Sequence, residues 1–197
     1  MATPLSDLQP APIRDPAQLE ALAEPTRFAI FETLQLGPAS IREIAEHLDR
    51  PAGSLYRHIA LLEALGLVKR VEQVPTERRA AWVYASFEPL PALTYQRGDD
   101  DSNRALGKVI DALTQRAARE FTEALLRGDV RTRGPQRNAF ASQFQGWLNA
   151  DELAQVNDLL DQLVELLRAG TRRADTQLVS LATVLRPPRT GSSGDSP

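Results

Sequence analysis

The sequence contains no cysteine, and this absence removes several kinds of chemistry together. Without thiols the chain forms no disulfide bond, holds no thiolate-bound metal and carries no thiol redox switch. Histidine is nearly as scarce, since the chain has only His47 and His58. Neither histidine belongs to a motif with a carboxylate pair or a nucleophile. A half-buried, hydrogen-bonded His58 is therefore favoured over a metal-ligating one.

Long apolar runs and catalytic motifs are also missing. No run of 18 or more apolar residues occurs, which predicts that no helix spans a membrane. Residues 1–14 lack the basic start and apolar centre of a secretory signal, so we expect a cytoplasmic protein. The sequence has no glycine-rich phosphate loop, Gly-x-Ser-x-Gly elbow or His-Glu-x-x-His motif. We therefore predict no enzymatic activity and no cofactor.

The charge balance lacks a basic excess, with a net charge of −3 over 197 residues. Its distribution is uneven. Residues 15–49 carry two basic side chains against seven acidic ones, whereas residues 50–79 carry six basic against three acidic. A local basic region of this kind is where phosphates would bind, and it predicts binding to nucleic acid that weakens steeply with salt.

The most informative stretch is residues 40–70. Ser40 and Glu43 have the spacing of a capping box, in which each side chain bonds a free backbone N–H, so a helix is predicted from Ile41. The helical apolar pattern stops at residues 49–51. Pro51 suits the first turn of a second helix, because its missing N–H would be unpaired there in any case.

This second helix has two different faces. Its core face is apolar at Leu55, Ile59, Leu62 and Leu65. The opposite face carries small residues around one tyrosine and one arginine, namely Gly53, Tyr56, Arg57, Ala60 and Ala64, with Ser54 at its edge. Small residues allow close approach to a DNA major groove, where an arginine can donate two hydrogen bonds to guanine. The alternative is an ordinary amphipathic helix in another helical bundle.

Two β-prone runs follow, at residues 67–74 and 81–87, separated by a basic segment that contains Arg78 and Arg79. They predict a hairpin with a basic tip. Two short helices followed by such a hairpin indicate a winged helix-turn-helix.

Over residues 15–88 the sequence resembles the ArsR-type winged-helix family of bacterial transcription regulators. The resemblance is carried by LAEPTRFAIFETL (22–34), SIREIAEHL (40–48) and SLYRHIALLEALGLV (54–68). It implies that Ser54, Tyr56 and Arg57 contact bases or nearby phosphates, and that Arg78 and Arg79 contact the backbone or minor groove. The complete predicted DNA-binding set is Ser40, Arg42, Arg50, Gly53, Ser54, Tyr56, Arg57, Arg78 and Arg79.

The pattern along the whole chain predicts a mainly α fold with a small β component (α+β). We expect a flexible arm at 1–14, a winged helix-turn-helix domain at 15–96 and a linker with a long helix at 97–130. An accessory, possible effector-binding segment at 131–186 and a disordered tail at 187–197 complete the chain. Within the domain, a helix at 18–23 precedes another that begins at Glu24-Pro25, whose Phe28, Ile30, Phe31 and Leu34 face the core.

The long helix is expected from about residue 103 to 127, with Gly128 as its stop. Its apolar stripe exceeds what a winged-helix core needs. The favoured interpretation is a dimer interface, because two-fold proteins match two-fold operators, and the alternative is a brace packed on its own domain. The predicted interface residues are Leu106, Val109, Ile110, Leu113, Ala117 and Phe121.

The segment after the long helix is predicted as a strand-helix-strand unit. Its helix spans 151–168, and its flanks are the β-prone run 176–187 and the ambiguous run 139–148, which also suits helical spacing. Phe140, Phe144 and Trp147 suggest a pocket for an apolar or organic effector. The alternative is that these rings form the core of a small accessory layer.

These patterns predict a homodimeric repressor that binds double-stranded operator DNA and responds to a non-metal signal. A winged-helix module that binds another protein is the main alternative. An enzyme with an active site in the C-terminal segment is a third, and no catalytic constellation favours it.

Overall fold

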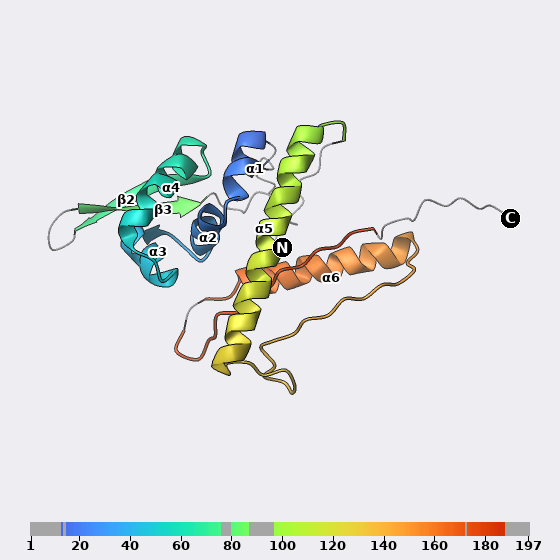
Figure 1. The fold of residues 1–197 in the computed structure, drawn as a ribbon. Helices are drawn as coiled ribbons and strands as arrows, with labels where there is room; N and C mark the ends of the chain where they lie inside the picture. The colour runs from blue at the N-terminus through green and yellow to red at the C-terminus, as the bar shows by residue number, and fades with distance from the viewer. Residues whose placement is uncertain (1–12, 14, 76–79, 87–96, 172, 188–197) are drawn as a thin grey trace, which may run out of the picture. The chain divides into compact units, whose positions relative to one another are not determined.

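The structure is a computed structural model that describes residues 13, 15–75, 80–86, 97–171 and 173–187. It divides into an N-terminal unit, Met1–Arg119, and a C-terminal unit, Glu120–Pro197. The helices and strands, shown in Figure 1, are α1 (Pro16–Leu22), α2 (Pro25–Thr33), β1 (Ala39–Ser40), α3 (Ile41–His47), α4 (Ala52–Ala64), β2 (Val68–Pro75), β3 (Ala80–Ser86), α5 (Asp100–Arg127) and α6 (Ala150–Arg168).

Both helices of the N-terminal pair start at a proline that follows an acidic cap. Asp15 caps α1 by accepting a hydrogen bond from the Ala17 backbone N–H, so α1 begins earlier than the sequence predicted. Glu24 caps α2 by accepting from the Arg27 N–H at 2.9 Å, and the predicted start at Glu24-Pro25 is confirmed.

The helix-turn-helix consists of α3, a short turn and α4. The capping box is confirmed, because the Glu43 carboxylate accepts from the Ser40 N–H at 2.7 Å and the Ser40 hydroxyl accepts from the Glu43 N–H. Asp49 turns the chain with a positive φ of 49°, a conformation that aspartate tolerates better than most residues. Pro51 is the N-cap of α4, one position before the first turn where the sequence placed it.

The predicted wing is confirmed as an antiparallel hairpin of β2 and β3, to which β1 adds a third strand in the order β1-β3-β2. The register shifts between Arg70 and Glu72, as a β-bulge does. The predicted tip residues Arg78 and Arg79 lie outside the described residues.

One hydrophobic core fills the N-terminal unit. It includes the predicted Phe28, Ile30, Phe31 and Leu34 of the α2 region, and Leu55, Ile59 and Leu62 of α4. Ala105 and Val109 of α5 are buried in the same core. Val109 is 0% exposed in the single chain. Its prediction as a dimer contact is wrong, because the core of its own unit already covers it.

The first half of α5 is a brace on the N-terminal unit. Besides its buried residues, it carries Lys108, whose Nζ lies 2.6 Å from the Glu20 carboxylate of α1. Arg116 Nη1 lies 2.7 Å from the Glu32 carboxylate of α2. The helix ends as predicted at Arg127, and Gly128 follows with a φ of 78°, a conformation that favours glycine.

The described residues of the C-terminal unit contain the end of α5, the helix α6 and no strand. Helix α6 begins with a second capping box, formed by Asn149 and Glu152, and it matches the predicted helix closely. Residues 139–148 and the described residues of 171–187 form no strand. The predicted strand-helix-strand unit is therefore wrong there. Threonine and valine favour extended backbone, but a strand also needs a neighbouring chain to accept its hydrogen bonds.

Candidate nucleic-acid interface

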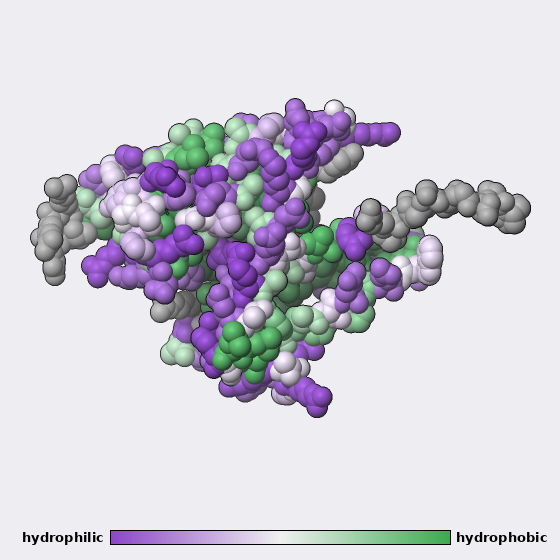
Figure 2. All heavy atoms as spheres, in the orientation of Figure 1, coloured by the Kyte–Doolittle hydropathy of each residue, from purple (hydrophilic) through white to green (hydrophobic). Residues whose placement is uncertain are grey.

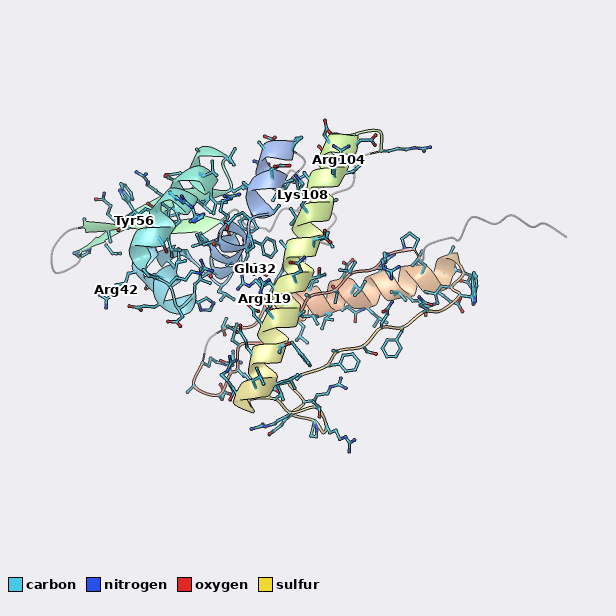
Figure 3. All side chains as sticks on the ribbon, viewed as in Figure 1. Glu32, Arg42, Tyr56, Arg104, Lys108 and Arg119 are labelled. Carbon is cyan, nitrogen blue, oxygen red and sulfur yellow. The ribbon has the colours of Figure 1, made fainter. Side chains whose placement is uncertain are left out.

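The outer face of α4 is the centre of the candidate site. Leu55, Ile59 and Leu62 anchor α4 in the core, so the opposite side of the helix faces outward. Gly53, Ser54, Tyr56 and Arg57 are exposed there, and 60% of the tyrosine surface is accessible. In Figure 3, Tyr56 and Arg42 are labelled on α4 and α3, away from Lys108 and Arg104 on α5. The two-faced helix predicted from the sequence is confirmed.

A shallow depression of about 600 Å³ lies at the N-terminal end of this face. It brings together five predicted DNA-binding residues and three that sequence reasoning did not select. The five are Arg50, Gly53, Ser54, Tyr56 and Arg57, and the three are Glu24, Thr26 and His58. The start of α2 therefore forms one wall of the site, and the start of α4 forms the other.

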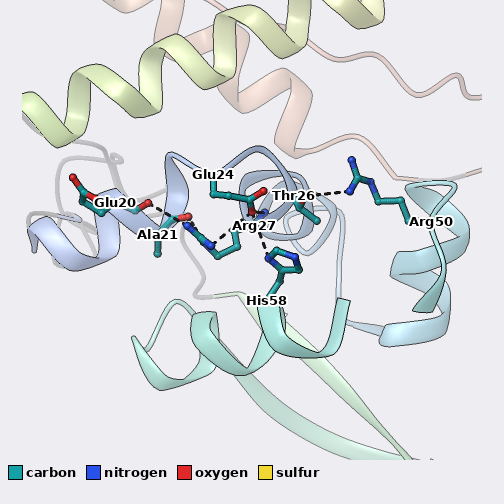
Figure 4. Close-up of polar contacts among 7 residues, drawn as sticks. All are labelled: Glu20, Ala21, Glu24, Thr26, Arg27, Arg50 and His58. Atoms are coloured by element: carbon teal, nitrogen blue, oxygen red, sulfur yellow. Dashed lines mark hydrogen bonds and ion pairs between the residues drawn. The ribbon is translucent and has the colours of Figure 1, made fainter. Parts of the chain in front are cut away.

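The two arginines of the depression differ in their surroundings. Arg50 Nη1 donates a hydrogen bond of 3.2 Å to the Thr26 hydroxyl across the two walls (Figure 4), which holds its guanidinium in one place. Arg57 is exposed, and no residue in the described part of the chain forms an ion pair or hydrogen bond with its guanidinium. Its five donors are available to a ligand.

Glu24 links the two walls at a second point. Its Oε2 lies 3.4 Å from His58 Nδ1 on α4 and 3.8 Å from Arg27 Nη1 (Figure 4). Burial raises the pKa of the Glu24 carboxyl, but hydrogen bonds from the Arg27 and Thr26 backbone outweigh burial, and the net pKa is lowered. The carboxylate is therefore charged at neutral pH.

His58 carries no net charge under the same conditions. Burial lowers the pKa of its imidazole, the Glu24 carboxylate opposes that effect, and Arg57 adds to the lowering. The net pKa lies below the usual value. The half-buried histidine with a carboxylate neighbour agrees with the sequence interpretation. Its role is to fix α4 against α2, which positions the exposed side chains nearby.

Ser40 and Arg42 lie at the start of α3, and both have partners within the chain. Ser40 is 7% exposed, and its hydroxyl donates to Glu43 at 2.8 Å. Arg42 is exposed and donates to Glu46 at 2.9 Å. Ser40 is thus engaged in capping, whereas the surface pair of Arg42 is weak enough for the arginine to exchange partners. Their DNA contacts stay predictions.

The base of the wing is tied to α4 through Arg70. Arg70 Nη2 lies 2.8 Å from the Glu63 carboxylate of α4, and its guanidinium stacks 5.3 Å from the centroid of the Trp82 ring on β3. A stacked arginine with a carboxylate partner has little freedom to move. The contact fixes the direction in which the hairpin leaves the domain.

Thr26, Glu24 and His58 show what sequence reasoning missed. Thr26 and Arg50 are 24 positions apart, and no periodicity connects them. The sequence identified Glu24 as a helix cap, which it is, but a cap has no visible link to a distant histidine. One signal in the sequence could have indicated these residues: Glu24 and Thr26 lie at the start of the helix that precedes the helix-turn-helix in the chain.

The predicted effector residues lie in the C-terminal unit. Phe140, Phe144 and Trp147 belong to a segment without regular structure, and their rings are exposed, Trp147 completely. Because all three residues are exposed, they form no core layer. Arg137 covers one ring, with its guanidinium 4.5 Å from the Phe140 centroid.

Residues 22–71 match a family model described as a helix-turn-helix domain. The match covers about a quarter of the chain and contains α3, the turn and all of α4. The chain carries a helix-turn-helix domain. With the hairpin of β2 and β3 directly after α4, the domain has the winged form. These findings support a DNA-binding regulator, and the match does not distinguish the ArsR type from other winged-helix families.

Two further comparisons add little. The chain has no match among curated proteins. A solved structure of ZitR from Lactococcus lactis, a mutant in its apo form, is 15% identical over 73% of this chain and 83% of that chain, with a TM-score of 0.32. A TM-score this low does not establish a common fold.

None of the described helices is long and apolar enough to cross a membrane. The described residues contain no cluster of His, Asp or Glu placed to hold a metal ion.

Proposed function

We propose that the protein is a sequence-specific transcription regulator that inserts α4 into the major groove of double-stranded operator DNA. One observation carries the proposal. Within the helix-turn-helix match, the outer face of α4 is exposed, is built of small residues around Tyr56, and presents the guanidinium of Arg57, which has no partner among the described residues. A solvated face without a ligand would more often carry Lys, Glu and Gln.

The chemistry of this face suits a base edge flanked by phosphates. Gly53 and Ala60 have no bulky side chain, so the helix backbone can approach the groove closely. Arg57 would donate two hydrogen bonds to one guanine. Arg50, held by Thr26, would contact a phosphate, and the wing would follow the neighbouring backbone with Arg78 and Arg79. Phosphate contacts would set the register, and Arg57 would read sequence.

We propose in addition that the protein acts as a homodimeric repressor whose interface includes α5. Val109 is excluded from this proposed interface because it is buried in the core of its own unit. Leu106 and Leu113 pack partly against the core, whereas Ile110, Ala117 and Phe121 are half-buried without belonging to it. Two copies related by a two-fold axis would place two α4 helices on two operator half-sites.

The DNA proposal is tested by selecting binding sequences from random DNA and repeating the measurement with Arg57→Ala. We expect specific binding to weaken by about 1–3 kcal/mol, with relaxed preference at one base pair per half-site. Arg104→Ala is the matched control, because Arg104 is an exposed arginine on α5 with a surface carboxylate partner, Asp101. Failure to select any sequence would favour a protein-binding winged helix. Unchanged specificity would remove Arg57 from base reading.

The wing requires a separate measurement, since its arginines are expected to contact the backbone. Arg78→Ala and Arg79→Ala should weaken binding to all sequences alike and reduce the salt slope by up to about one unit each. A loss confined to particular sequences would show that the wing reads bases.

The dimer is tested with Ile110→Glu, since Ile110 is half-buried and lies outside the core contacts of Leu113. Sedimentation should show a weaker dimer whose protomers keep a folded winged-helix domain. Gln115→Glu, an exposed position on the same helix, should remain dimeric. An unchanged association state of Ile110→Glu would show that α5 is only a brace.

The signal that we propose is an apolar or organic compound received in the C-terminal half. Its support is the group of exposed aromatic rings at Phe140, Phe144 and Trp147. Trp82→Phe leaves Trp147 as the remaining tryptophan, so fluorescence can follow it while hydrophobic metabolites are titrated. If compounds that release DNA leave Trp147 unperturbed, the signal enters elsewhere.

A further inference from the structure

Helix α6 is well formed locally, but none of its apolar side chains is fully buried. It spans 19 residues, begins with a capping box and ends with Arg168 in its last turn. No residue of α6 is buried, and Leu159 and Leu166 are 64% and 72% exposed. Isolated helices of this length are marginal in water, and packing of an amphipathic face normally supplies their stability. The apolar face of α6 therefore needs a partner surface for its stability.

The apolar side chains of α6 form a regular seam, in which Leu153, Leu163 and Leu167 are exposed and Val156 and Leu160 are half-buried. Large apolar residues recur at alternating spacings of three and four, in the order Leu153, Val156, Leu160, Leu163 and Leu167. This is the a/d pattern with which helices interlock in coiled coils and bundles. Leu159, Val164 and Leu166 widen the apolar face on both sides of this seam, which we call the α6 seam.

The charges of α6 allow the seam to meet an identical one. The helix is acidic, and an acidic helix would normally repel its own copy. At 100° per residue, however, Asp151, Asp158 and Glu165 lie on the side opposite the α6 seam. The positions that flank the seam after the first turn are mostly apolar, including Leu159 and Val164. Two copies can therefore pair without placing carboxylates face to face.

The amount of apolar surface also matches a stable interface. Figure 2 shows hydrophobic residues at the molecular surface in this part of the chain. The exposed large apolar side chains of α6 and its flanking segments include Phe144, Trp147, Leu166, Leu178 and Leu185. With about 150–250 Å² for a whole aromatic side chain and less for leucine, the exposed apolar residues of α6 and its flanking segments together amount to on the order of 1,000 Å², and the α6 seam is one part of that surface. A standard interface buries about 800 Å² per partner.

We propose that the α6 seam pairs with the α6 seam of a second copy of this chain. The occupant is a second copy because the a/d spacing of the seam can interlock with an identical helix and Asp151, Asp158 and Glu165 lie on the opposite side. It is also continuous along the chain with the surface proposed for the α5 dimer, since α5 runs into the C-terminal unit through Phe121, Leu125 and Leu126. Leu125 and Leu126 are exposed, the latter at 84%. The proposal does not depend on DNA binding.

The natural absence of cysteine makes the test direct. In the full chain, Leu160→Cys places one thiol in the middle of the α6 seam, and Gln162→Cys places one thiol on the outer face as the matched control. We expect mild oxidation to link Leu160→Cys into covalent dimers and to leave Gln162→Cys monomeric on a denaturing gel. Mixing Leu153→Cys with Leu167→Cys then gives the orientation, because an antiparallel pair links the two different variants.

A second variant keeps the result interpretable. Leu163→Glu should raise the dimer dissociation constant at least about tenfold in sedimentation, and Gln155→Glu on the outer face should not. Two outcomes would overturn the proposal: equal cross-linking of Leu160→Cys and Gln162→Cys, or a Leu160→Cys thiol that stays monomeric. Protection of that monomeric thiol from alkylation would show that the chain covers the seam itself, and free alkylation would show an uncovered face.

The seam and the DNA proposal can fail separately. Cross-linked Leu160→Cys dimers that bind no selected DNA would overturn the proposed function alone. Retained DNA selection without cross-linking would overturn the α6 pairing alone.

Discussion

Two leucines show how differently the two units of this protein use the same kind of helix. Leu62 of α4 and Leu159 of α6 both lie on the apolar side of an amphipathic helix. Leu62 is 0% exposed in a core that α1, α2, α3 and the hairpin share, whereas Leu159 is 64% exposed. Periodicity produces a face, and only a second layer of structure turns that face into a core.

Helix α5 contains the same contrast within one element. Val109 is buried in the N-terminal core, and Leu126 near the other end is among the most exposed leucines of the described residues. The sequence pattern is continuous between them, but the supporting layer is not. The units therefore differ in burial: the N-terminal unit has its own core, whereas no residue of α6 is buried.

Truncation of an apolar side chain should give the largest difference in unfolding free energy between the two units. Leu62→Ala should lower the free energy of unfolding of the N-terminal unit by about 2–5 kcal/mol, because it removes buried methyl groups and leaves a cavity. Leu159→Ala should change it by less than about 0.5 kcal/mol, as surface substitutions do. Denaturant unfolding followed by Trp82 fluorescence measures both. Similar losses would show that the units share one core.

The two capping boxes offer a smaller and matched comparison. Ser40→Ala removes a cap whose helix is packed in the core, and should lower the free energy of unfolding by about 0.5–2 kcal/mol. Asn149→Ala removes the equivalent cap of α6. It should reduce the helical circular-dichroism signal and leave the unfolding midpoint of the N-terminal unit unchanged. A shift of that midpoint by Asn149→Ala would contradict the separation of the units.

The ion pair between α5 and α1 should contribute less to stability than the helix cap at Ser40. The Lys108–Glu20 pair is close, at 2.6 Å, but both side chains are about half exposed. Exposed pairs contribute roughly 0.2–1 kcal/mol and are screened by salt. Lys108→Ala should therefore lower stability slightly at low salt and hardly at all at high salt. A large loss that persists at high salt would mean that the pair is effectively buried.

The smallest effect that we expect is a pH dependence confined to the N-terminal unit. The folded pKa of His58 is lowered, so at mildly acidic pH the unfolded chain binds a proton that the folded chain resists. Stability should fall as pH drops from about 7 to about 5, above the range where Glu24 titrates. His58→Gln should flatten this slope. His47→Gln is the control, and a slope that persists in His58→Gln would assign the titration elsewhere.

Much of the winged-helix domain could be predicted because its signals are local. Ser40 and Glu43 are one helical turn apart, Glu24 directly precedes Pro25, and Gly128 follows the last residue of α5. A capping hydrogen bond or a positive φ depends on a few neighbouring residues, which the sequence displays side by side. The two faces of α4 follow in the same way from a repeat of 3.6 residues.

The remaining features join residues that are distant in the chain. The Thr26 hydroxyl positions Arg50, the Glu24 carboxylate faces His58, and Val109 fills a core formed mainly before residue 87. Residues 139–148 and 176–187 have strand-like or ambiguous composition but no neighbouring strand. Sequence alone determined the approximate helices, the caps at Glu24 and Ser40 and the outward position of Tyr56 and Arg57. Only the tertiary structure decided which apolar faces are covered, because burial requires a second surface and its position is not encoded in local periodicity.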